Sequence, residues 1–78
     1  MSLLARALRA PGIDARIEAC IAAGGFEPLA VYDRPTLRKW ARAKVARHEE
    51  EIPPELRPFV GAMVDWIYAE MMLKRKAG

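Results

Sequence analysis

The sequence has few of the residues that stabilise small secreted or metal-bound domains. It contains one cysteine, Cys20, and one histidine, His48. A single cysteine makes no intrachain disulfide, and the two residues together are too few for a structural zinc site of the usual Cys/His kind. We therefore expect a chain without disulfides that binds no metal and no cofactor, in a reducing cytoplasm.

Long apolar runs are also lacking. No stretch approaches the ~18–20 consecutive apolar residues that span a bilayer, and the first residues show no basic start followed by a long apolar segment. We expect neither a membrane contact nor a signal peptide. The charge imbalance is small, because 13 basic and 10 acidic residues give a formal net charge of +3. Such a charge permits contact with nucleic acid or with an acidic protein but requires neither.

What the sequence does have is the composition of a globular domain. Of its 78 residues, 53% are hydrophobic and 29% are charged, which excludes a disordered chain. This length predicts a single helical domain over residues 1–78. A domain of this size buries only about 60% of the surface of its unfolded chain, so an isolated monomer would be marginally stable. This estimate favours self-association.

Hydrophobic periodicity predicts an all-α fold, a small bundle of three to four helices with a long apolar C-terminal helix. The expected helices cover residues 2–10, 13–24, 34–50, and 54 or 58 to 76. Ser2 is the expected cap of the first helix, and Gly24-Gly25 is the expected end of the second. The segment 26–32 is expected to be a loop, because Pro28 disfavours a helix through it.

Residues 34–47 carry the strongest charge signal, with six basic residues and no acid. Three interpretations are open: a solvated helix face offset by Glu49–Glu51, a face that docks on an acidic protein, or a face that neutralises phosphates. The candidate partner-binding residues are Arg34, Arg38, Lys39, Arg42 and Arg47.

The run Thr36-Leu37-Arg38-Lys39-Trp40 resembles the start of the recognition helix in excisionase-like and other helix-turn-helix DNA-binding proteins. This resemblance covers about five residues and implies a DNA-binding regulator that uses Arg34, Thr36, Arg38, Lys39 and Arg42. The expected spacing is against it, because about ten residues separate the second and third helices and a helix-turn-helix needs a turn of ~3–4.

The C-terminal helix supplies a second candidate surface. Its aromatic and methionine side chains adapt well to a partner surface and are frequent binding hot spots. Either they form core alone, or they form core on one side and a homodimer or partner interface on the other. The candidate interface residues are Phe59, Met63, Trp66, Ile67 and Met71. Glu70 falls within this apolar arc and is expected to pair with a basic residue of the third helix or to lie at an interface rim.

No arrangement of acid, base and nucleophile suggests an enzyme. His48 is expected to be a boundary residue and Cys20 a small buried one. The leading hypothesis is a small protein-binding module that regulates, adapts or inhibits a larger partner with an acidic surface. We expect this module to form a homodimer. In size and type only, the chain resembles phage- or mobile-element-encoded inhibitors such as anti-CRISPR proteins. The alternatives are the DNA-binding regulator and a component of a larger assembly.

Overall fold

The computed structural model describes residues 3–9 and 12–77. Within them the chain forms five α-helices and two 3₁₀ turns, and no strand occurs among these residues. The elements are α1 (Leu3–Ala7), α2 (Ile13–Ala22), α3 (Glu27–Ala30), α4 (Arg34–Val45), η1 (Glu49–Glu51), η2 (Pro54–Leu56) and α5 (Arg57–Ala77). The predicted small all-α bundle is confirmed.

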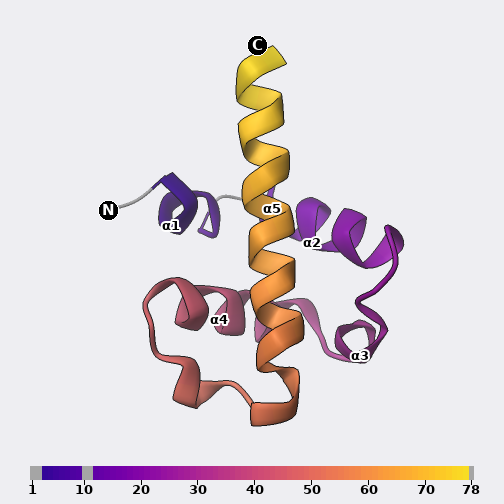
Figure 1. The fold of residues 1–78 in the computed structure, drawn as a ribbon, viewed down its shortest axis with the longest axis vertical. Helices are drawn as coiled ribbons and strands as arrows, with labels where there is room; N and C mark the ends of the chain where they lie inside the picture. Colours follow the sequence, from indigo (N-terminus) through magenta and orange to yellow (C-terminus); the bar gives the residue numbers. More distant parts are fainter. Residues whose placement is uncertain (1–2, 10–11, 78) are drawn as a thin grey trace.

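Helix α5 is the axis of the molecule (Figure 1). Helices α1 and α4 lie on one side of it, and α2 and α3 lie on the other. The largest helix–helix contact joins α4 to α5, followed by that between α2 and α5. The C-terminal end of α5 projects beyond the four other helices (Figure 1), so only the first part of this helix is surrounded by the bundle.

The core forms where the apolar faces of α2, α4 and α5 meet. Its largest fully buried side chains are Leu8, Ile17, Leu29, Leu37, Ile52, Met63, Ile67, Val60 and Cys20. The spacing of Ile13, Ile17 and Cys20 on α2 matches one helical face, as the sequence predicts. No helix in the described part of the chain is long and apolar enough to cross a bilayer.

Three expectations for the elements are wrong, and the first concerns α1, which ends at Ala7 rather than at residue 10. The segment 26–32 is not simply a loop, because α3 forms within it with Pro28 in its first turn. Proline is tolerated there, since the first N–H groups of a helix have no intrahelical acceptor. The third expected helix ends at Val45 rather than near Glu50. The expected cap Ser2 lies outside the described residues. At the end of α2, Gly24 and Gly25 adopt φ values of 90° and 85°, which other residues rarely adopt.

A glycine inside α5 gives a first test of the packing. A Cβ built on Gly61 meets only the Cε atom of Lys44, at the ordinary contact distance of 3.5 Å. We therefore expect Gly61→Ala to stabilise the domain by about 0.5–1 kcal/mol, because alanine has the better helix propensity. Urea denaturation followed by circular dichroism measures this change. A loss of stability would show instead that the α4–α5 crossing requires glycine at this position.

Candidate functional site

Helix α4 carries most of the candidate binding residues, and its ends are fixed by local sequence. Asp33 adopts an extended conformation at the N-cap, and Pro35 lies in the first turn. At the other end, the N–H of His48 donates to Ala43 O at 2.8 Å and the N–H of Arg47 donates to Lys44 O at 3.2 Å. This pair of hydrogen bonds is a Schellman motif, which ends the helix sharply.

The residue at the left-handed position of this motif is Arg47, with φ 63°. Glycine is the usual residue there, because a Cβ makes this conformation cost about 1–2 kcal/mol. The chain therefore keeps an exposed arginine where glycine would be more stable. A strained residue of this kind is a reason to ask whether its side chain has a function.

We expect Arg47→Gly to stabilise the domain by about 1 kcal/mol, because it relieves the left-handed strain. Arg47→Ala is the matched control: it removes the same charge but keeps a Cβ, so its stability should stay within about 0.5 kcal/mol of wild type. Thermal unfolding of the three proteins measures both effects. Equal stability of the glycine and alanine variants would contradict the strain at this position.

The first two candidate arginines face the neighbouring helix α2. Arg34 Nε forms an ion pair with Glu18, and Arg38 Nε lies 3.3 Å from Asp14 Oδ1. The second pair lacks hydrogen-bond geometry, since Asp14 Oδ1 has no hydrogen-bond partner. Both pairs are partly exposed, so each contributes little to stability. They nevertheless direct Arg34 and Arg38 along the α2–α4 contact and offset their charge.

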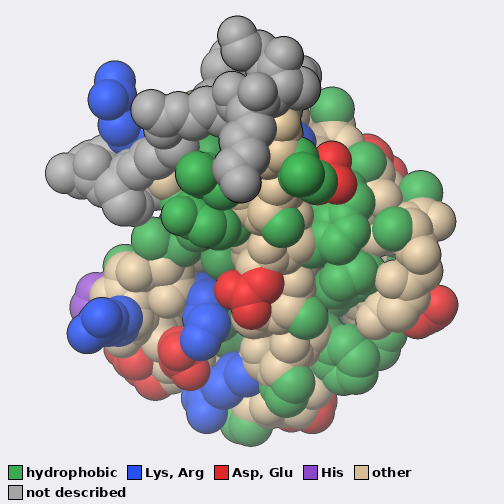
Figure 2. Space-filling model, turned by 45° about the horizontal axis from the view of Figure 1, so that its top comes forward, with side chains coloured by type: hydrophobic (Ala, Val, Ile, Leu, Met, Phe, Trp, Pro, Cys, Tyr) green, Lys and Arg blue, Asp and Glu red, His purple; other side chains and the backbone are tan. Residues whose placement is uncertain are grey.

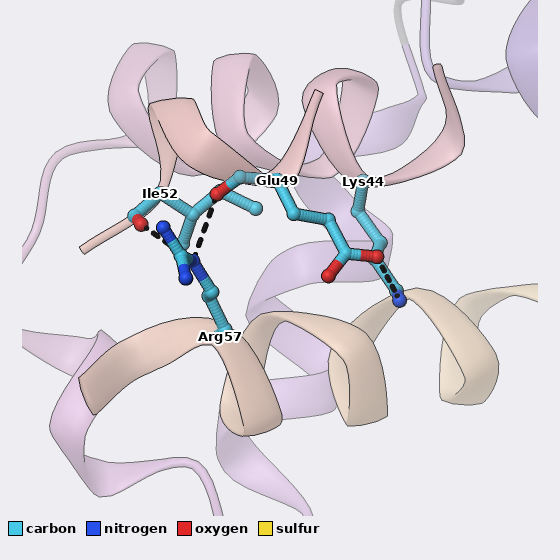
Figure 3. Close-up of polar contacts among 4 residues, drawn as sticks. All are labelled: Lys44, Glu49, Ile52 and Arg57. Carbon is cyan, nitrogen blue, oxygen red and sulfur yellow. Dashed lines mark hydrogen bonds and ion pairs between the residues drawn. The ribbon is translucent and has the colours of Figure 1, made fainter. Parts of the chain in front are cut away.

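The turn after α4 is tied to α4 by Lys44 and to α5 by Arg57 (Figure 3). Lys44 Nζ donates to Glu49 Oε1 at 2.7 Å. Arg57 Nε donates to the carbonyl oxygens of Glu49 and Ile52, at 2.9 and 3.0 Å. The hydrogen bond from Lys44 and its charge lower the pKa of the Glu49 carboxyl. Glu49 therefore stabilises the fold above its ordinary pKa, and this contribution is lost as the pH falls through the lowered value.

Three basic side chains remain on the outward surface: Lys39, Arg42 and Arg47 are exposed and form no ion pair with any described side chain. Lys39 and Arg42 are three residues apart, so they share one face of α4. We call Lys39, Arg42 and Arg47 the basic face. In Figure 2 the single histidine, His48, lies beside basic side chains at the left edge of the molecule. Helix α1 packs against α4, and two arginines, Arg6 on α1 and Arg9 in the turn after it, are exposed.

The candidate interface residues of α5 divide between core and surface. Met63 and Ile67 are fully buried and Met71 nearly so, all within the monomer core. Phe59 and Trp66 are only partly buried. The structure therefore leaves two of these five side chains within reach of a partner. Sequence periodicity predicts that all five side chains lie in one arc of about 180° on the helix. It does not predict which part of this arc the other helices cover.

A groove lies between α2 and the C-terminal half of α5, with a volume of about 700 Å³. Its walls are formed by Gly12, Ala15, Arg16, Ala19, Trp66, Glu70 and Leu73. Glu70 is exposed at this groove, and its place at an interface rim stays a prediction. The α2 side of the groove is not among the predicted surfaces, although alanines at positions 15 and 19 are spaced to share one helix face.

The remaining candidate groups are separate from these surfaces. Cys20 is buried, and this burial raises the pKa of its thiol to about 11, so the thiolate nucleophile is not formed near neutral pH. His48 is exposed, with Nδ1 3.5 Å from Glu50 Oε1. Among the residues that the structure describes, no three metal-ligating side chains come together.

Comparisons with protein-family models, with curated proteins and with solved structures give no match for this chain. The function must therefore be argued from the surfaces themselves.

Proposed function

We propose that the chain is a small, non-enzymatic protein-binding module that regulates, adapts or inhibits a larger partner. In this proposal the basic face docks on an acidic surface of that partner, in the cytoplasm, and the module is a homodimer. The single buried cysteine suits a reducing compartment.

The observation that carries this proposal is the division of the basic residues of α4 and of the turn that ends it. Arg34, Arg38 and Lys44 have acidic partners within the chain. The basic face has none among the described side chains, and it is exposed, with Lys39 and Arg42 on α4 and Arg47 in the turn that ends this helix. Charges of one sign left without partners on a rigid element favour binding to a surface of opposite charge, because complementary potentials speed encounter and select partners.

DNA binding remains the second candidate, and one feature of the fold favours it. Helix α3 shortens the expected ten-residue gap, since only residues 31–33 separate α3 from α4. That length fits a helix-turn-helix turn. Against it, α3 has four residues, and Arg34 and Arg38 at the start of α4, where base contacts are made, face acids of α2 instead.

Light scattering with a short random DNA duplex distinguishes the two functions. Phosphate contacts weaken steeply as salt rises. We expect any complex with the duplex to be lost at a physiological salt concentration of about 0.15 M. A saturable complex that persists at this salt would contradict the protein-binding proposal and place DNA binding first.

A further inference from the structure

Helix α5 has an apolar strip that runs from its first half into its projecting half. Ala62, Trp66, Ala69 and Leu73 follow one another at spacings of four, three and four residues, which places them on one face of the helix. This is the spacing of a helix–helix seam. Ala62 and Ala69 are exposed, Leu73 is 63% exposed and Trp66 is partly buried. The strip therefore lies outside the monomer core.

The strip continues into the groove between α2 and α5. Trp66 and Leu73 form the α5 wall of this groove, and Gly12, Ala15 and Ala19 form much of the α2 wall. The two walls thus differ: one carries large apolar side chains, and the other carries small residues apart from Arg16. A large side chain of one molecule can pack against the small residues of another, which is how close-packed interfaces fill space.

The groove also carries one charge of each sign. Arg16 on α2 and Glu70 on α5 both line it, and they do not form an ion pair within the chain. A two-fold interface must be self-complementary, so that each residue meets its counterpart in both directions. The pairing of Arg16 with Glu70, and of Trp66 and Leu73 with the alanines, meets this requirement.

We propose that a second copy of this chain occupies the groove. The seam is isologous: Trp66 and Leu73 of each copy pack against Ala15 and Ala19 of the other, and Glu70 of each copy pairs with Arg16 of the other. This inference deepens the homodimer of the proposed function by naming its seam, and it does not depend on the basic face. A nucleic acid or an anionic membrane would instead require charges of one sign, which this groove lacks.

Charge reversal tests the seam through its own symmetry. Arg16→Glu and Glu70→Arg should each weaken the homodimer by about 100-fold, because each creates two like-charge contacts per dimer. An equimolar mixture of the two variants should form a heterodimer, since every contact then joins opposite charges. The double variant, which carries both reversals, should regain the homodimer. Analytical ultracentrifugation measures each mass against the 8.7 kDa of one chain.

Two results would overturn the proposal. One is a wild-type chain that sediments as a monomer at concentrations up to about 100 µM. The other is a dimer that both single variants retain, which would place the seam elsewhere. Circular dichroism checks that both variants are folded, which we expect because neither side chain is fully buried. Reversing the basic face should leave the dimer intact, so loss of partner binding and loss of self-association are separate outcomes.

Discussion

Reversal of the basic face, with Lys39, Arg42 and Arg47 all changed to Glu, is expected to abolish binding to the protein partner. An acidic surface that attracts three cations would repel three carboxylates, and we expect the affinity to fall by at least about 100-fold, or ~2.7 kcal/mol. The domain should stay folded, because all three side chains are exposed and form no ion pair with a described side chain. Wild type and variant are immobilised in parallel, and the proteins that each captures from an extract of the native cells are quantified.

The matched control keeps every charge while changing every side chain. Lys39→Arg, Arg42→Lys and Arg47→Lys together should capture the same protein as wild type, within about threefold, because a docking contact driven by charge tolerates this exchange better than reversal. Capture of the same proteins by the reversed variant would show that the basic face is only solvated. Loss of capture by the exchange variant alone would indicate bidentate arginine recognition instead.

Truncation of Ile67 to Ala is expected to unfold most of the protein. Ile67 is 0% exposed and belongs to the hydrophobic core. Removing such a side chain costs about 2–5 kcal/mol. A core of this size supplies only about 3–5 kcal/mol of net stability, so one cavity removes most of it. Urea denaturation at two protein concentrations measures the loss in the free energy of unfolding. This loss should be the same at both concentrations, because Ile67 lies in the core of one chain.

Leu73→Ala provides the comparison on the same helix. Its side chain is 63% exposed, so the monomer should keep its stability within about 0.5 kcal/mol. Because Leu73 lies in the proposed seam, its truncation should weaken the dimer instead. If Ile67→Ala remained as stable as wild type but became monomeric, the buried face of α5 would be an intermolecular surface, as one interpretation of the sequence suggests.

The sequence predicts the bundle well where the pattern is local. The periodicity of α2, the helix start at Asp33 and Pro35, and the burial of Cys20 all follow from residue spacing. Pro28 predicts a loop over 26–32, yet α3 forms there because the first turn of a helix tolerates proline. The sequence does not predict the end of α4, because no glycine marks it and Arg47 adopts the left-handed conformation instead.

The candidate site depends on tertiary contacts that one-dimensional patterns do not contain. The sequence does not distinguish the six basic residues between positions 34 and 47. In the structure three of them form ion pairs with acidic residues of α2 and η1. Nothing in the local sequence pairs Arg34 with Glu18, because the two residues lie on different helices. The same holds for α5, whose apolar arc is wide enough for both core and surface. Only the packing of the other helices determines that Met63 is buried and Leu73 is exposed.

Zero-length carbodiimide cross-linking tests the central claim most directly, because it joins a lysine amine to a carboxylate in contact with it. Lys44 serves as the internal standard and should link to Glu49, which lies 2.7 Å away within the chain. We predict that Lys39, on the basic face, links to an aspartate or glutamate of another protein when the chain is treated in an extract of its native cells. Peptides in which Lys44 is linked to Glu49 but Lys39 is linked to no other protein would contradict an acidic docking partner.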